Sequence, residues 1–238
     1  MARLNNERTI GGQAWAFMIP YLLYTAVASF WPVAWDQVTG QGLRFLITAA
    51  ALLYFRRSYA FGRMELKHAL LPLLWAGVAV VLWVLPLQIL HTYFNVEEVA
   101  VPADADNPLF IILRIANAGL LVPIFEELAM RAFILEWGFN AGQGKSIPEA
   151  LSNLLAAWDQ KPLVLQRLPV SAFSVIFATV IFALGHAPVE YVSAIIYFLL
   201  TMGLYVYTRS LWACIITHVF TNVMLLMLAK WGAYTFLW

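Results

Sequence analysis

The order of apolar and polar residues along the chain predicts seven apolar segments joined by polar loops. They lie at about residues 14–31, 43–55, 69–90, 108–139, 170–187, 189–207 and 211–229. A straight helix needs roughly 20 mostly apolar residues to cross a bilayer, and the second segment has only about 13. We expect that segment to be tilted, or to be helped by Arg44 snorkelling to the interface. The pattern predicts an all-α, polytopic membrane protein of about seven transmembrane helices.

The composition favours the same class. Of the 238 residues, 63% are hydrophobic and 11% are charged, whereas a soluble domain has about 25% charged residues. The net charge of +1 gives no indication of a nucleic-acid partner. The single cysteine, Cys214, excludes an intrachain disulfide. The first apolar run is long and no small-residue cleavage site stands out, which favours an uncleaved first span over a signal peptide. We expect one integral membrane domain over residues 1–238.

The charged residues between the segments predict an orientation. Ten of the 14 Lys and Arg residues fall in loops on one side: Arg3, Arg8, Arg56, Arg57, Arg63, Lys67, Lys145, Lys161, Arg167 and Arg209. The opposite loops carry the acidic residues Asp36, Glu97, Glu98, Asp104, Asp106 and Glu190. Because basic loops stay in the cytoplasm, we expect the N-terminus and the basic loops to be cytoplasmic.

The loop at residues 140–169 is too long to be a plain connector. Ser146 and Glu149 are spaced as a capping box, with Pro148 in the first turn. Apolar residues follow at helical spacing: Ile147, Leu151, Leu154, Leu155 and Trp158. These features predict a short amphipathic helix at residues 147–158, lying on the cytoplasmic membrane surface near the mouth of a central cavity. The alternative is a helix packed on the end of the bundle.

Three ionisable residues interrupt the fourth apolar segment: Glu126, Glu127 and Arg131. A charged side chain at bilayer depth costs roughly 2.5–3.5 kcal/mol or more, so such residues usually face a protein interior and serve a function. Glu127 and Arg131 are four residues apart and share a helix face, which predicts an ion pair. Glu126 lies about 100° around the helix and is left free for chemistry. The alternative is a purely structural ion-pair cluster between helices.

Two histidines also lie inside apolar segments, His186 four residues after Phe182 and His218 four residues before Asn222. Counting from the cytoplasmic ends at about 1.5 Å per residue puts Glu126, His186 and His218 at depths of roughly 18, 24 and 12 Å. These depths predict a central intramembrane polar cavity. The alternative for each histidine alone is a hydrogen-bonded packing residue.

The residue types in this cavity suit peptide hydrolysis. Glu126 with His186 has the groups needed to activate water by general-base catalysis. His218 and Asn222 offer donors for a developing oxyanion. A zinc ion held by Glu126 or Glu127 with His186 and His218 is an alternative on ligand type, although the His-Glu-x-x-His signature is absent. We favour a metal-free site.

Cys214 lies four residues before His218 and raises the alternative of a thiol nucleophile. A lone cysteine in an apolar helix is more often a small hydrophobic residue, and we expect that here.

Three motifs in order carry a family resemblance: Glu126-Glu127-x-x-x-Arg131, Phe182-x-x-x-His186 and His218-x-x-x-Asn222. Together they resemble the CAAX prenyl endopeptidase family, also called the CPBP or ABI family. The resemblance covers about residues 108–229, which would form the catalytic core. The N-terminal half, and residues 210–214 before the last motif, also resemble the bacterial subgroup found with exosortase protein-sorting systems.

The resemblance implies an all-helical intramembrane protease; eukaryotic members remove the last three residues after a prenylated cysteine. It implies that Glu126 and His186 activate water, that His218 and Asn222 hold the oxyanion, and that Glu127 and Arg131 support them. Family members are described both as metalloproteases and as glutamate proteases. This chain is shorter than the eukaryotic members, and in a bacterium prenylated proteins are not an expected substrate.

The expected function is therefore an intramembrane endopeptidase acting near the terminus of a membrane-associated or lipid-modified protein or peptide. The expected location is the bacterial inner membrane, and the oligomeric state is left open. The alternative is a non-catalytic membrane protein that uses the polar cluster to bind a peptide or a partner protein. A transporter is less favoured, because no inverted repeat or broken helix pair appears in the sequence.

Overall fold

The computed structural model describes residues 12–32, 35–59, 61, 64–94, 101–159, 170–232 and 234–237. Within these ranges every regular element is helical and no strand occurs, so the all-helical class is confirmed. Some residues on which the predictions depend lie outside the described residues: Arg3, Arg8, Arg63, Glu97, Glu98, Lys161 and Arg167. The same applies to the side chains of Leu154, Leu155 and Trp158, from the predicted apolar stripe at residues 147–158.

The helices match the predicted apolar segments. They are α1 (Gly12–Phe30), α2 (Gln37–Phe55), α3 (Leu71–Phe94), a long interrupted helix (Pro108–Ala141), α8 (Ala172–Leu184), α9 (Tyr191–Thr208) and α10 (Leu211–Trp231). Among the described residues, five helical stretches are long and apolar enough to cross a membrane: Gln37–Ser58, Leu66–Phe94, Pro108–Ala141, Pro188–Thr208 and Leu211–Trp231. Two shorter apolar helices cover Ala14–Phe30 and Ala172–Leu184. The chain is an integral membrane protein, and the count of seven spans stays a prediction.

α2 is longer than the sequence predicts. It begins at Gln37, where Asp36 caps it by accepting a hydrogen bond from the backbone N–H of Thr39 at 2.9 Å. The first turns of α2 contain polar residues, so the pattern of apolar residues in the sequence does not show that the helix begins here. Gln41 is buried, because Asn117 on the long helix donates its amide to the carbonyl and the side-chain oxygen of Gln41, at 2.8 and 2.9 Å. The shortfall predicted for this segment is therefore wrong.

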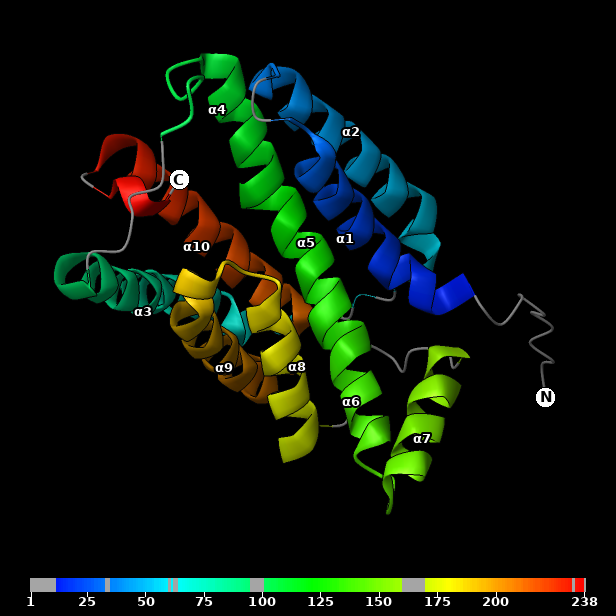
Figure 1. Ribbon diagram of the computed structural model, residues 1–238. Helices are drawn as coiled ribbons and strands as arrows, with labels where there is room; N and C mark the ends of the chain where they lie inside the picture. The colour runs from blue at the N-terminus through cyan, green and yellow to red at the C-terminus, as the bar shows by residue number, and fades with distance from the viewer. Residues whose placement is uncertain are drawn as a thin grey trace.

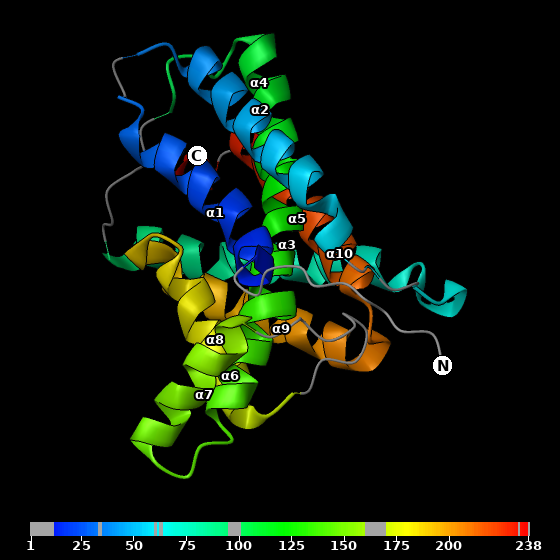
Figure 2. The same ribbon diagram turned by 90° about the vertical axis from the view of Figure 1, so that its right-hand side faces the viewer.

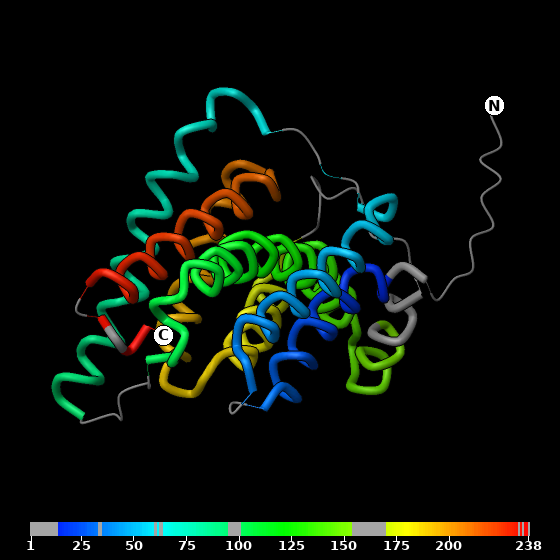
Figure 3. The backbone as a smooth tube through the Cα atoms, turned by 90° about the horizontal axis from the view of Figure 1, so that it is seen from above, coloured from blue at the N-terminus to red at the C-terminus, as the bar shows by residue number. Residues whose placement is uncertain are grey.

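The long helix runs through the middle of the molecule (Figure 1). It consists of α4 (Pro108–Arg114), the π-helical segment η3 (Ile115–Leu121), α5 (Val122–Glu127), the π-helical segment η4 (Leu128–Ile134) and α6 (Leu135–Ala141). α1 and α2 pack together on one side of it, and α10 lies on the other side with α3 beyond (Figure 3). The two glutamates thus lie between two wide-turn segments at the centre of the bundle.

Pro123 gives a local reason for the first π-helical segment. The backbone N–H of Val122 bonds to the carbonyl of Asn117, five residues back, in place of the α-helical partner Ala118. In the same register the carbonyl of Ala118 would accept from residue 123, but proline has no N–H. The Ala118 carbonyl is therefore left without a backbone donor inside the helix. Such π-segments occur frequently at functional sites.

The predicted helix after the long helix is present as α7 (Ile147–Asp159). Ser146 caps it by accepting from the backbone N–H of Glu149 at 3.4 Å. The helix packs against α6 and α1, at the end of the long helix opposite α4 (Figures 1 and 2). Its residues Ile147 and Leu151 are exposed, as a helix lying on a membrane surface requires.

The hydrophobic core lies where η4 meets α8, α9 and α10. Its largest fully buried apolar side chains there include Leu128, Phe182, Tyr197 and Phe198. Phe182 packs against both Tyr197 and Phe198, with ring centroids 6.0 and 5.1 Å apart. This packing fixes α9 against α8 and sets the position of the cavity described next.

Candidate active site

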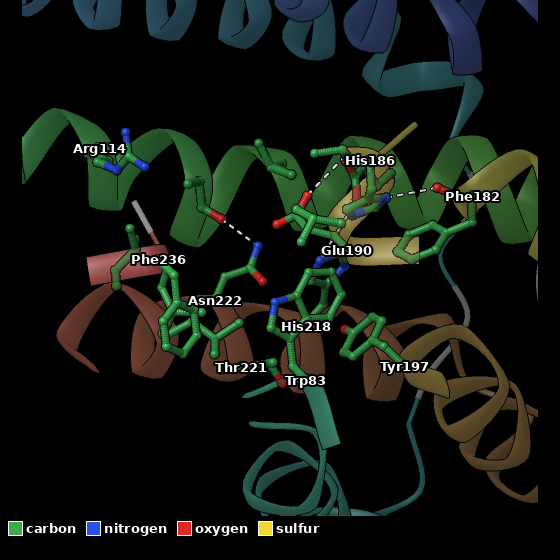
Figure 4. Close-up of a pocket in the computed structure, with 18 of the residues that line it drawn as sticks. Trp83, Arg114, Phe182, His186, Glu190, Tyr197, His218, Thr221, Asn222 and Phe236 are labelled. Atoms are coloured by element: carbon green, nitrogen blue, oxygen red, sulfur yellow. Dashed lines mark hydrogen bonds and ion pairs between the residues drawn. The ribbon is translucent and has the colours of Figure 1, made fainter. Parts of the chain in front are cut away.

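A cavity of about 430 Å³ lies between α3, the long helix, α8, α9 and α10 (Figure 4). Glu126, His186, His218 and Asn222 all line it. A central polar cavity is therefore present, and three segments that are far apart in the sequence each contribute a polar group to it. The catalytic roles predicted for these residues stay predictions.

Four of the residues that line the cavity lie toward one end of the bundle and are called the rim. They are His91 near the C-terminal end of α3, Arg114 on α4, Glu190 on the 3-10 helix η5 (Pro188–Glu190) and Phe236 on the 3-10 helix η6 (Thr235–Leu237). α7 lies at the other end (Figure 1), and none of its described side chains, at residues 147–153, lines the cavity. The expectation that this helix lies near the cavity mouth stays a prediction, because residue depths alone cannot tell which end of a cavity is open.

Glu127 is completely buried behind the cavity wall. It forms the predicted pair with Arg131, which donates from Nη1 to Oε2 of Glu127. Its other oxygen, Oε1, lies 3.1 Å from Nδ1 of His218. Arg131 is also completely buried and donates from Nη2 to the hydroxyl of Thr201 on α9. Its guanidinium carbon lies 4.7 Å from the ring centroid of Phe198. The pair therefore connects the long helix to two others, Glu127 to α10 through His218 and Arg131 to α9 through Thr201.

Glu126 turns toward the cavity instead. Its side chain keeps 15% of its exposure, against 1% for Glu127. The nearest cation-forming group is Nε2 of His218, 3.8 Å from Oε2 of Glu126, which is beyond hydrogen-bond distance. Among the described residues no donor bonds to this carboxylate, so it is available to a water or a substrate.

His186 lies just beyond α8 and not inside the helix, which corrects the sequence prediction. α8 ends at Leu184, because Pro188 forces the residue before it into an extended conformation. Nδ1 of His186 lies 2.8 Å from the carbonyl of Phe182. A carbonyl only accepts, so Nδ1 carries the proton, and Nε2 of neutral His186 has a free lone pair. The ring also packs against Trp83, with centroids 5.5 Å apart.

The contacts of His218 restrict its protonation in a similar way. Glu127 is an ionised acceptor because it pairs with Arg131, so the proton between it and His218 belongs to Nδ1. Nε2 then lacks a proton in the neutral ring and carries one only in the imidazolium. Two carboxylates, Glu126 and Glu127, lie within 4 Å of this ring.

Asn222 is fixed by the interrupted helix. Its Nδ2 donates to the carbonyl of Ala118 at 2.8 Å, which supplies the donor that this carbonyl lacks inside its own helix. α10 approaches closely here, since a Cβ at Gly119 would lie 2.9 Å from Cγ2 of Val223. One hydrogen of the Asn222 amide remains for another acceptor.

Sequence reasoning missed the contribution of α9 and α3. Tyr197 and Trp83 line the cavity, and Thr201 holds Arg131. A signal was available, because Ser193, Tyr197 and Thr201 recur every four residues in an otherwise apolar helix and so share a face. All three are buried in the structure.

Cys214 takes no part in the cavity. It is completely buried, and its sulfur lies 3.7 Å from the carbonyl of Thr201. It does not line the cavity, so it has the packing role that its apolar setting predicts.

A metal ion needs several ligand side chains close together. In the parts of the chain that the structure describes, no group of three or more His, Cys, Asp or Glu side chains is placed to hold one. Glu126 and His218 approach each other to 3.8 Å, but no ring nitrogen of His186 lies within 4 Å of Glu126 or Glu127. A catalytic zinc takes three protein ligands, so the arrangement does not fit the zinc alternative.

Comparisons with known proteins complete the description. Residues 108–224 match a family model described as Rce1-like, type II CAAX prenyl endopeptidase Rce1-like. The match covers the long helix, α8, α9 and most of α10, including all three motifs. It supports the resemblance to the CAAX endopeptidase family and does not extend to the exosortase-associated subgroup. The comparisons with curated proteins and with solved structures found no match.

Proposed function

We propose that this membrane protein is an intramembrane endopeptidase of the CAAX type. The match of residues 108–224 to the type II CAAX prenyl endopeptidases implies this activity. The observation that carries the proposal is the meeting of Glu126, His186, His218 and Asn222 in one cavity. An ion pair that is fully buried behind the cavity, between Glu127 and Arg131, holds the arrangement in place.

In the proposed mechanism Glu126 is the general base. Glu126 and His186 line the same cavity and make no direct contact within 4 Å, so the proposed mechanism places a water molecule between them. That water donates one hydrogen bond to Glu126 and one to Nε2 of His186, whose Nδ1 proton is held by the Phe182 carbonyl. Glu126 takes the proton of the water as the oxygen attacks the substrate carbonyl.

The developing negative charge on the carbonyl oxygen is stabilised from the α10 side. The imidazolium of His218 donates from Nε2, and Asn222 donates the amide hydrogen that Ala118 does not use. Glu126 then passes its proton to the leaving amide nitrogen. The C–N bond breaks and Glu126 returns to its starting charge. The second proton of the water leaves the new carboxyl group for the released amine, so the products are a carboxylate and an ammonium.

Glu127, Arg131 and Thr201 act by positioning. Glu127 holds the Nδ1 proton of His218 and so directs Nε2 into the cavity. Arg131 and Thr201 hold Glu127 in place from two helices. Catalytic groups need such support, because a small misplacement costs much of the rate.

The proposed substrate is a membrane-associated or lipid-modified protein or peptide, cut near one terminus while in contact with the bilayer. The apolar residues of the lining, including Trp83, Val122, Phe182, Leu225 and Leu226, suit a greasy chain or a lipid group. The proposed location is the bacterial inner membrane, with the N-terminus in the cytoplasm.

The experiment that tests the function compares cells carrying wild-type protein with cells carrying Glu126→Ala. Peptides and small proteins of the membrane fraction are compared by mass spectrometry, with attention to their termini. The proposal requires at least one protein to be shortened only in the wild-type cells. Identical termini in both strains, with the protein bound to a membrane peptide in each, would instead favour the non-catalytic binding function.

A further inference from the structure

The hydroxyl group of Tyr197 is buried without a hydrogen-bond partner. The residue is 2% exposed, and no donor or acceptor among the described residues forms a hydrogen bond with its oxygen. A buried polar group in this condition usually costs about 1–3 kcal/mol. An orphaned hydroxyl therefore needs an explanation, such as an absent ligand.

Tyr197 is placed at the reacting centre. It lines the cavity, and its ring reaches from α9 to the side of His218 (Figure 4). The two ring centroids are 5.2 Å apart. Trp83 meets the Tyr197 ring edge-on at 5.8 Å and Phe182 stacks against it at 6.0 Å. The ring is therefore held on several sides, and its position does not depend on the hydroxyl.

The backbone of this residue is fixed by the machinery behind the cavity. The hydroxyl of Thr201 donates to the carbonyl of Tyr197 at 2.9 Å and accepts from Arg131. Arg131 in turn pairs with Glu127, which holds His218. One buried hydrogen-bond network therefore fixes the positions of Tyr197 and His218 relative to each other.

The other donors on this side of the cavity are partly engaged. One amide hydrogen of Asn222 is used by Ala118, and Nδ1 of His218 is used by Glu127. Asn222 keeps one amide hydrogen for a substrate, and His218 has an Nε2 hydrogen to donate when its ring is an imidazolium. A tetrahedral oxyanion has three lone pairs, so it accepts one more hydrogen bond than His218 and Asn222 supply.

We propose that the Tyr197 hydroxyl is a further catalytic residue, which donates a hydrogen bond to the oxyanion formed on the substrate carbonyl beside His218. The inference rests on the proposed peptidase function and adds a third donor from a helix that carries none of the sequence motifs. A phenol is neutral and has one O–H to give, so it needs no change of charge to act. Because it has no partner in the resting cavity, no bond has to be broken when the oxyanion forms.

The test compares Tyr197→Phe with the wild type and with the matched control Tyr205→Phe. Tyr205 lies two turns further along α9, is completely buried and does not line the cavity. All proteins are purified in detergent. Activity is measured on two internally quenched peptides that end in Cys-aliphatic-aliphatic-Met, one farnesylated on the cysteine and one not. Melting temperature is recorded for each protein, and Glu126→Gln serves as the inactive reference.

Tyr197→Phe is expected to lower kcat by about 10²–10³-fold, as loss of one oxyanion donor does elsewhere, with KM unchanged. Its melting temperature should equal or exceed that of the wild type, because the substitution removes an unpartnered buried hydroxyl. Tyr205→Phe should keep the wild-type kcat. A purely structural role for Tyr197 would show the opposite pattern, with a lowered melting temperature.

Two other results overturn the idea in different ways. If the wild type cuts a peptide, Glu126→Gln does not, and Tyr197→Phe keeps the wild-type kcat, the role of Tyr197 is refuted while the peptidase function stands. If neither peptide is cut by the wild type and no membrane protein differs between wild-type and Glu126→Ala cells, the peptidase function itself fails, and the role of Tyr197 fails with it.

Discussion

Nδ1 of His218 on α10 lies 3.1 Å from Oε1 of Glu127 on the long helix, and both side chains are almost completely buried. This contact determines which ring nitrogen of His218 faces the cavity. It also divides two adjacent glutamates, since Glu127 is engaged by His218 and Arg131 while Glu126 faces the cavity without a hydrogen bond among the described residues. The first predictions depend on this division.

Glu126→Gln is expected to abolish most of the activity and leave folding near normal. The amide keeps the size of the side chain but cannot accept the proton of the water, so the rate should fall by at least about 10²–10⁴-fold. Little stability should be lost, because the carboxylate has no hydrogen-bonded partner among the described residues. Hydrolysis of a reporter peptide and the melting temperature in detergent measure both effects. Full activity in this variant would rule out Glu126 as the base.

Glu127→Ala is expected to lose stability and expression as well as activity. Removing one member of a buried pair leaves Arg131 uncompensated, which costs about 3–5 kcal/mol, and His218 loses the acceptor of its Nδ1 proton. Thermal unfolding in the same detergent shows the loss. If Glu127→Ala melts like the wild type while Glu126→Gln collapses, the two roles have been assigned the wrong way round.

A double substitution in the same cluster separates two effects: the loss of stability from an unpaired charge, and the loss of activity from a side chain that is no longer held in position. Glu127→Gln with Arg131→Met removes both charges, so part of the stability lost in Glu127→Ala should return. The activity should not return, since His218 is no longer held by a carboxylate. Equal melting temperatures for the single and double variants would show that the unpaired charge is not the cause.

Chelation is expected to leave the activity unchanged. The described side chains include no group of three that could hold a metal ion, and the proposed mechanism uses Glu126 and His186 alone to activate water. The purified protein is incubated with 1,10-phenanthroline, and the non-chelating 1,7-isomer serves as control. Loss of activity with the chelator only, restored by added zinc, would favour a zinc-bound water instead.

The orientation predicted from the loop charges has its own test. Reporter fusions placed after Ala103 and after Trp238 should report the non-cytoplasmic side, because the basic loops stay in the cytoplasm. A third fusion in the turn at Arg209 serves as the cytoplasmic control. Cytoplasmic signals from Ala103 and Trp238 together would reverse or disprove the topology.

Most helices could be predicted from the sequence, because an apolar run of membrane length allows little else. The start of α2 could not, since Gln41 is satisfied by Asn117, a residue 76 positions away. Pro188 predicts that α8 ends before His186. The sequence prediction that placed His186 inside the helix did not use this signal. The helices themselves and the end of α8 therefore follow from local sequence signals. The start of α2 depends on a tertiary contact, which no local signal predicts.

The candidate site divides in the same way. The pairing of Glu127 with Arg131 follows from their spacing on one helix, so the sequence predicts it. The hold of Glu127 on His218 needs two helices to be in register, which no spacing reveals. Tyr197 and Thr201 give only a periodic polar stripe on α9, and nothing in that stripe says which helix it faces. Counting residues at α-helical spacing also could not predict the π-helical segment before Pro123.

The position of the cavity rim bears on what becomes of the cleaved fragments. The rim residues His91, Glu190 and Phe236 lie at the end of the bundle away from the loops that carry Arg56, Lys145 and Arg209. If those loops are cytoplasmic, as their charges predict, a substrate terminus would reach the rim from the far side of the membrane, after export. The proposed peptidase would then release its short fragment outside the cytoplasm. Cleavage would be a one-way step that marks a protein as delivered.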